Sequence, residues 1–166
     1  MSKIILSIVA IYLPVLLLGQ IPKKIMECNF PIDSLSRKVK ATETHSDTYY
    51  YKGQPYTGCA AEDLPEEKGV FIIEVENGKL IRNIAYYANG QMEREFLFQN
   101  GQSHGKHRMF FPNGAPYIEE EYDKGKPIGT HRRWHNNGQL AREAIFVNGL
   151  KIQENIFDKQ GLIIRP

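Results

Sequence analysis

The sequence predicts an all-β fold, an elongated antiparallel meander of repeated β-hairpins, and two observations carry the prediction. The first is one pattern written three times, over residues 85–108, 109–132 and 133–156. Its glycines keep their place in each unit, as at Gly90, Gly114 and Gly138. The second is a series of turn signals that recur at steps of 11 to 13 residues. Repetition at such periods is typical of repeat architectures.

Asn-Gly pairs between aromatic and β-branched runs mark the turns. They occur at Asn77-Gly78, Asn89-Gly90, Asn100-Gly101, Asn113-Gly114, Asn137-Gly138 and Asn148-Gly149. Asn-Gly is the strongest short-range hairpin signal, because a type I′ turn needs positive φ at both central residues. About seven to nine residues remain between turns, which is one strand. We therefore expect two-residue type I′ turns at all six pairs.

Alternation within these strands predicts which side chains share a face of the sheet. In the first unit, Met92, Phe96 and Phe98 fall on one side. In the third unit the same side carries Leu140, Ala144 and Phe146. In the second strand of the unit, the aromatic residue at the equivalent position is Phe110 and, one repeat later, Trp134.

Two-residue turns also predict which charged side chains face each other. They set Glu95 opposite Lys106, Arg108 opposite Glu119 and Arg132 opposite Glu143. Opposite charges in such cross-strand pairs contribute about 0.2–1 kcal/mol each. We interpret the recurring Glu and Arg as structural rungs of the sheet.

The chain before the repeats divides into an expected signal peptide at 1–20 and a polar connector at 21–49, with the repeat domain at 50–166. Lys3 precedes an uncharged run at 4–19. That run is shorter than the roughly 20 apolar residues of a spanning helix, and a short apolar run after a basic residue is typical of a secretory signal. We expect a periplasmic or secreted protein. The alternative is a protein that keeps the segment at 1–20 uncleaved as an N-terminal anchor. Residues 60–68 are expected to form an acidic loop.

Cys28 and Cys59 are the two cysteines of the chain. An even cysteine count in an exported protein favours a disulfide, although two unrelated thiols are the alternative. A bridge would tie the connector to the start of the repeats and contribute about 3–4 kcal/mol by closing its loop.

These motifs resemble the variant MORN repeat family, in particular bacterial proteins described as MORN-repeat antitoxin components. The resemblance rests on the stretches KGQPYTG at 52–58 and YYANGQ at 86–91, and on the later Asn-Gly units with their aromatic flanks. It implies a stack of β-hairpins used for protein contacts, and in some members proposed for lipid contacts. The antitoxin description implies neutralisation of a partner toxin. The third unit departs from the pattern, with Gln153 where Gly105 and Gly129 stand earlier.

Composition and motifs favour a non-enzymatic protein without a cofactor. Lys and Arg number 21 against 19 Asp and Glu, a balance that argues against nucleic-acid binding. The three units at 85–156 hold one Ser, one Thr and no Cys, which argues against nucleophilic catalysis. A metal site is one interpretation of four histidines in the repeats, His104, His107, His131 and His135. Equivalent histidines two strands apart lie about 10 Å apart, too far for shared zinc ligation, so we expect solvated histidines and no metal.

One basic and aromatic patch remains as a candidate binding surface. It comprises Lys106, Arg108, Phe110, Arg132, Arg133 and Trp134. Arg and aromatic residues are enriched at protein interfaces. We therefore expect an exported protein-binding module or scaffold whose partner is another protein. The alternatives are an antitoxin or immunity-type binder of one toxin, and a peripheral lipid or glycan binder. A last strand near Leu162 with no repeat after it also allows edge-strand oligomers.

Overall fold

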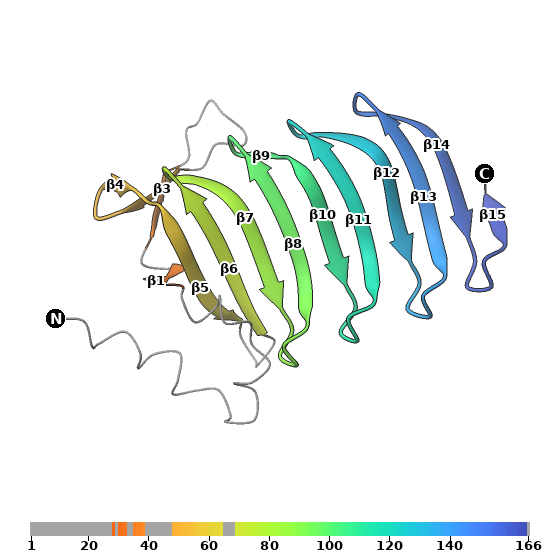
Figure 1. Ribbon diagram of the computed structural model, residues 1–166, viewed down its shortest axis with the longest axis horizontal. Helices are drawn as coiled ribbons and strands as arrows, with labels where there is room; N and C mark the ends of the chain where they lie inside the picture. The colour runs from red at the N-terminus through yellow and green to blue at the C-terminus, as the bar shows by residue number, and fades with distance from the viewer. Residues whose placement is uncertain (1–27, 29, 33–34, 39–47, 65–68, 166) are drawn as a thin grey trace.

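A computed structural model describes residues 28, 30–32, 35–38, 48–64 and 69–165 of this chain. Its main feature is one long twisted sheet in which hairpin follows hairpin (Figure 1). Neighbouring strands are antiparallel, except that β1 pairs with β5 in parallel. The predicted all-β meander of hairpins is therefore confirmed. The expected signal peptide at 1–20 lies outside the described residues.

The long sheet contains twelve strands. They are β1 (Phe30–Pro31), β5 (Gly58–Leu64), β6 (Gly69–Glu76), β7 (Lys79–Tyr86), β8 (Met92–Gln99), β9 (Gln102–Ser103), β10 (Gly105–Phe110), β11 (Pro116–Asp123), β12 (Lys126–Trp134), β13 (Leu140–Val147), β14 (Leu150–Phe157) and β15 (Ile163–Arg165). A small second sheet contains β2 (Ser36–Lys38), β3 (Thr48–Tyr51) and β4 (Gln54–Pro55).

The expected acidic loop at 60–68 is wrong over its first half. Strand β5 pairs with β6 along its whole length, from Gly58 opposite Val75 to Leu64 opposite Gly69. Ala60 is fully buried opposite Ile73. The apolar residues of β6 require a covering neighbour, and this tertiary pairing outweighs the local acidic composition. Residues 65–68 lie outside the described part.

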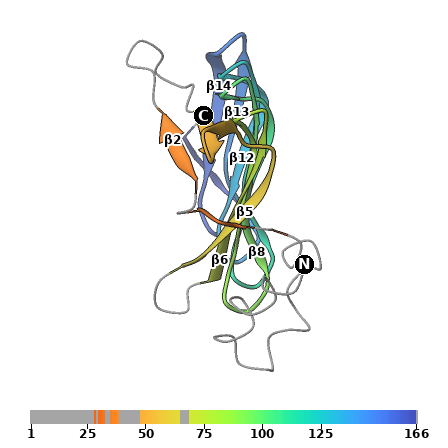
Figure 2. The same ribbon diagram turned by 90° about the vertical axis from the view of Figure 1, so that its left-hand side faces the viewer.

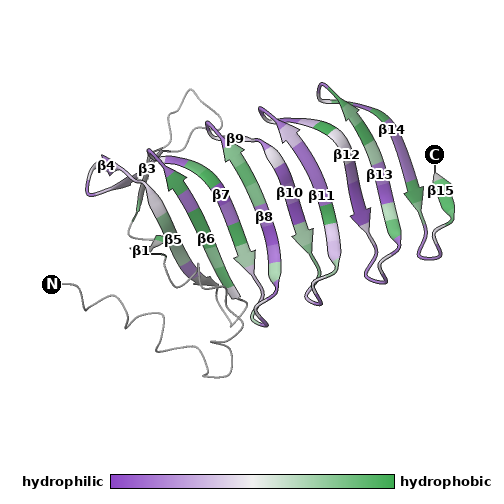
Figure 3. Ribbon diagram, in the orientation of Figure 1, coloured by the Kyte–Doolittle hydropathy of each residue, from purple (hydrophilic) through white to green (hydrophobic). Residues whose placement is uncertain are grey.

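The core sits at the N-terminal end, where β6 is covered on both faces. One cluster contains Val70, Ile72, Ile84 and Tyr86. The other contains Tyr56, Ala60, Ile73 and Val75, and side chains of the small sheet and the segment before it pack on it. Figure 2, seen from this end, shows β2 beside the long sheet, and Figure 3 shows hydrophobic residues along β6. The strands that follow have only one layer and are therefore stabilised largely by side chains lying across the sheet.

The turns are of two kinds, which corrects the prediction of a single type. Both central residues have positive φ at four turns of the long sheet, as at Asn100 (51°) and Gly101 (77°). Lys124-Gly125 adopts the same type I′ conformation without an asparagine. At Asn89-Gly90, Asn113-Gly114 and Asn137-Gly138 the glycine alone has positive φ.

At this second kind of turn the asparagine acts as a side-chain acceptor. The Oδ1 atom of Asn113 accepts a hydrogen bond from the backbone N–H of Ala115 at 3.0 Å, and Gly114 donates to the carbonyl of Phe111. This is a type I turn followed by a left-handed glycine, and it carries one extra residue on one strand. The preceding turn of this kind shifts the register next to Tyr86. Met92 consequently packs with Tyr86 and Ile84, not on the face of Phe96 as predicted.

Candidate binding face

Seven charged side chains of alternating sign cross one face of the sheet, and we call them the charge ladder. They are Glu74, Arg82, Glu95, Arg108, Glu119, Arg132 and Glu143, on β6, β7, β8, β10, β11, β12 and β13. The predicted pairings of Arg108 opposite Glu119 and of Arg132 opposite Glu143 are confirmed. The Nε of Arg132 lies 2.8 Å from a carboxylate oxygen of Glu143.

Glu95 is the most buried member of the charge ladder, with its side chain 8% exposed. It accepts hydrogen bonds from Arg82, whose Nε lies 2.8 Å away, and from Arg108. Burial alone would raise the pKa of Glu95, but the hydrogen bonds and positive charges of Arg108 and Arg82 outweigh it and lower that pKa. The carboxylate is therefore held ionised between two arginines.

The predicted pairing of Glu95 with Lys106 is wrong, since Arg108 stands opposite Glu95. The turn itself has the expected register, with Phe98 opposite Ser103. Two extra residues are then accommodated between His104, whose N–H still donates to the carbonyl of Leu97 in the register of the turn, and Arg108, and Gly105 in this stretch has a φ of 77°. A left-handed glycine of this kind permits a bulge that shifts the pairing.

The opposite face carries a row of stacked rings, which we call the ring ladder. It contains Phe96, Phe98, His107, Tyr122, His131 and Phe146. The His107 ring lies 4.7 Å from those of Phe96 and Tyr122, and His131 lies 4.4 Å from Phe146. Burial, followed by a hydrogen bond to Glu120, raises the pKa of Tyr122 to about 12.

His107 and His131 are buried, at 7% and 3% exposure, which corrects the expectation of solvated histidines. Each follows a bulge glycine by two residues, and its Nε2 meets a backbone carbonyl there: Leu97 at 2.8 Å and Glu121 at 3.0 Å. The imidazole of His107 thus shares the carbonyl of Leu97 with the backbone N–H of His104, which donates to it at 3.0 Å. Burial, more than any neighbouring group, lowers the pKa of His107.

The recurring sequence Gly-x-His-Arg, at 105–108 and 129–132, combines these roles. Its glycine lies in the bulge with positive φ, its histidine contacts a backbone carbonyl of the neighbouring strand, and its arginine enters the charge ladder on the other face. The identical spacing was a signal that these histidines are structural. The third unit has Gln153 in place of the glycine, and there the register shifts by a single residue, between Ile145 and Phe146.

The candidate patch predicted from the sequence is divided between the two faces. Lys106, Arg108 and Arg132 lie on the charge-ladder face, and strand alternation places Phe110 and Trp134 beside them. Arg133 lies on the ring-ladder face, where its guanidinium is 3.6 Å from Glu120. The arginine side chains are 40–47% exposed, while Phe110 and Trp134 are partly buried.

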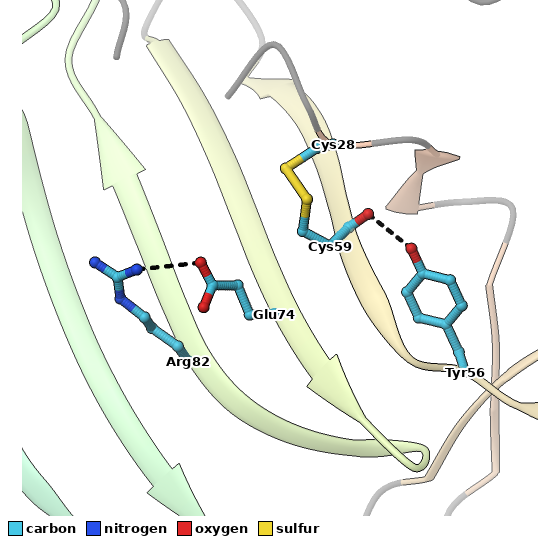
Figure 4. The surroundings of a disulfide bond; sticks show 5 residues. All are labelled: Cys28, Tyr56, Cys59, Glu74 and Arg82. Carbon is cyan, nitrogen blue, oxygen red and sulfur yellow. Dashed lines mark hydrogen bonds and ion pairs between the residues drawn. A yellow bond between two sulfur atoms is a disulfide. The ribbon is translucent and has the colours of Figure 1, made fainter. Parts of the chain in front are cut away.

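Cys28 and Cys59 are joined by a disulfide, with their Cα atoms 4.9 Å apart (Figure 4). The bridge attaches the segment before β1 to β5, beside the pairing of Phe30 with Ala60. The hydroxyl of Tyr56 donates to the carbonyl of Cys59 at 2.7 Å. Cys28 and Cys59 also pack on the cluster around Ile72. The disulfide therefore links the chain before β1 to the N-terminal end of the core, where Cys59 stands opposite Glu74, the first residue of the charge ladder.

Within the described ranges, no three His, Cys, Asp or Glu side chains converge as metal ligands would. The same residues include no helix that is long and apolar enough to cross a membrane.

The family described as MORN repeat variant matches residues 82–100, 103–124 and 127–148. No curated protein matches the chain. The crystal structure of TarM is similar at 12% identity and a TM-score of 0.30, over 74% of this chain and 21% of that one. The family matches run from β7 to the turn after β13, which is the part that carries both ladders. Between residues 82 and 148 this chain therefore carries three consecutive repeats of the MORN repeat variant type.

Proposed function

We propose that this chain is an exported, non-enzymatic scaffold that binds a protein partner through its charge-ladder face. MORN repeats are generally protein- or membrane-binding modules, which supports a binding role. The observation that carries the choice of face is the placement of Phe110 and Trp134 beside Arg108 and Arg132 on an open, single-layered sheet. Aromatic residues and arginines are the side chains most enriched at interface hot spots.

The alternating charges favour a protein over an anionic membrane. Glu95 and Glu143 are each bonded to an arginine of the ladder, and Glu119 stands between two of them. The face is therefore close to neutral, whereas binding to acidic lipid headgroups relies on a surplus of Lys and Arg. A protein surface that carries both positive and negative side chains can instead pair with the alternating charges of the ladder, and this complementarity fixes how the two surfaces align.

The export part of this proposal rests on the sequence at 1–20, and the partner's chemistry decides the finer function. A toxin as partner would make the chain an antitoxin or immunity-type protein. A structural envelope protein as partner would make it a scaffold. This proposal includes no catalytic role, because the three units at 85–156 hold a single Ser, a single Thr and no Cys.

The test is affinity isolation of the tagged full chain from the envelope of its own cell, read by mass spectrometry. We expect one stoichiometric protein, and we expect Trp134→Ala to weaken its binding by about 2 kcal/mol, roughly 30-fold. Arg132→Glu should abolish capture, while Arg133→Glu provides a matched control. The control has the same charge change at the adjacent position and similar exposure (47% against 40%), but it lies on the other face.

Two results would count against this proposal. Equal loss of binding in Arg132→Glu and Arg133→Glu, with both variants folded by circular dichroism, would show that the charge-ladder face is not the site. Recovery of lipid or glycan without protein would move the function to peripheral lipid or glycan binding.

A further inference from the structure

The C-terminal end of the long sheet is an uncovered and aliphatic edge. Strand β15 pairs with β14 only at Ile156 and Phe157. Within the described part of the chain, no strand lies along the outer side of β14 from Leu150 to Asn155, or beyond β15 (Figure 1). We call these two stretches the terminal edge. Its unpaired backbone groups are a template for a further strand.

The side chains of the terminal edge are unusually exposed for their type. They are Leu150 (72%), Ile152 (64%), Leu162 (66%), Ile163 (58%) and Ile164 (65%). Contiguous exposed aliphatic residues mark interaction sites more often than plain surface. A sheet edge that remains solvent-exposed usually carries charges or proline as protection. At the other end of the sheet, β1 pairs with β5 and the disulfide holds it there.

We propose that the terminal edge pairs with the same edge of a second copy of this chain, forming a two-fold symmetric dimer with a continuous sheet. Every neighbouring pair from β5 to β15 is antiparallel. An antiparallel β14–β14 contact continues that alternation. Pairing of two identical strands in this way is self-complementary, as a two-fold axis requires.

Charge complementarity selects a second copy over a foreign strand. Lys151 and Glu154 are three residues apart on β14, and within one chain they form an ion pair at 2.6 Å. In the antiparallel register centred between Ile152 and Gln153, Lys151 stands opposite Glu154 of the second copy, and the reverse pair forms symmetrically. Leu150 then faces Asn155. This register covers the whole unpaired stretch of β14 without placing like charges together.

The dimer and the proposed binding function use different surfaces, so an experiment can refute one proposal without refuting the other. The terminal edge lies beyond β13, while Trp134 and Arg132 lie on β12 with a further strand on each side. A Trp134→Ala variant is therefore expected to dimerise as the parent does, whatever its effect on a partner.

Sedimentation of the full chain over a concentration series tests the dimer. We expect a monomer–dimer equilibrium that Ile152→Lys weakens by at least about tenfold, because it sets a charge at the centre of the contact. Val147→Lys is the matched control: it is also an exposed aliphatic position (49%), but β13 already has a strand on each side. A monomer at every concentration overturns the proposal, as does equal dimerisation of Ile152→Lys and the parent.

A charge exchange then tests the register. Lys151→Glu alone should weaken the dimer by on the order of tenfold, since it sets carboxylates opposite each other twice. The double change Lys151→Glu with Glu154→Lys should restore it. Failure of restoration in a variant that is folded by circular dichroism overturns the register. If the double variant does not fold, the comparison of Ile152→Lys with Val147→Lys decides. A foreign protein on this edge of an otherwise monomeric chain also contradicts the proposal.

Discussion

Replacing Glu95 with alanine should cost far more stability than the same change at Glu143, although the two occupy the same place in the repeat. The Glu95 side chain is 8% exposed and accepts hydrogen bonds from Arg82 and Arg108. Glu143 is 28% exposed and is bonded to Arg132 alone. The pair therefore separates the effect of burial from that of residue type.

The magnitudes follow from what each change leaves behind. Breaking a fully buried ion pair costs about 3–5 kcal/mol. Arg82 keeps its contact with Glu74 at 3.1 Å, and Arg108 is 44% exposed, so water and a second partner compensate in part. We expect about 2–3 kcal/mol for Glu95→Ala. For Glu143→Ala we expect about 0.5–1 kcal/mol, as for an exposed pair.

Urea unfolding followed by circular dichroism measures both costs from the shift in the midpoint at constant slope. Equal losses for the two variants would refute the reasoning, because the burial of Glu95 would then contribute nothing. The pH dependence gives a second check. The pKa of Glu95 is lower in the folded chain than its ordinary value of 4.5. Its contribution is therefore present above pH 4.5 and is lost as pH falls through the folded pKa. The difference between parent and Glu95→Ala should shrink accordingly.

Three further predictions concern other parts of the fold. Because burial lowers the pKa of His107 below its ordinary value of 6.5, the parent should lose stability as pH falls from 6.5 toward the folded pKa, and His107→Phe should show a flatter urea-midpoint profile over that range. Gly69→Ala should lower the thermal midpoint much more than Gly53→Ala, since an added Cβ would lie 1.8 Å from a backbone oxygen at Gly69 but meets nothing within 4 Å at Gly53, where positive φ alone costs about 1–2 kcal/mol. Reduction of the Cys28–Cys59 disulfide should lower the free energy of unfolding by about 3–4 kcal/mol, and a Cys28→Ser, Cys59→Ser variant should be insensitive to reductant.

Part of the candidate face was predictable because hairpin geometry is local. A type I turn with a left-handed glycine and a type I′ turn both connect adjacent antiparallel strands. The turn at Asn137-Gly138 is not of the expected type and sets Trp134 opposite Leu140, but the register shift between Arg133 and Trp134 offsets it, so the prediction of Arg132 opposite Glu143 held. The error at Glu95 arose where the chain adds two residues beyond the turn, which a count from the turn alone misses.

The division of the candidate patch had a different cause. Arg132 and Arg133 are adjacent in sequence, and composition alone grouped them as one basic stripe. On a strand, adjacent residues face opposite sides, so Arg133 joins Glu120 on the ring-ladder face. The burial of His107 was missed because its carbonyl partner, Leu97, lies on the neighbouring strand, and the bulge that shifts the register between these strands does not follow from the turn alone.

The sequence by itself determined the spacing of the turns, the antiparallel order of the hairpins and the phase of the repeat. Each of these depends on φ preferences and alternation within about a dozen residues. Tertiary structure decided the pairing of β1 with β5, the strand at Gly58–Leu64 and the double-sided covering of β6. The first and the last of these join segments far apart in the chain, whereas the strand at Gly58–Leu64 forms beside β6 because burial of Ile72 and Ile73 outweighs the local acidic composition. No local pattern encodes which distant segment will provide that cover.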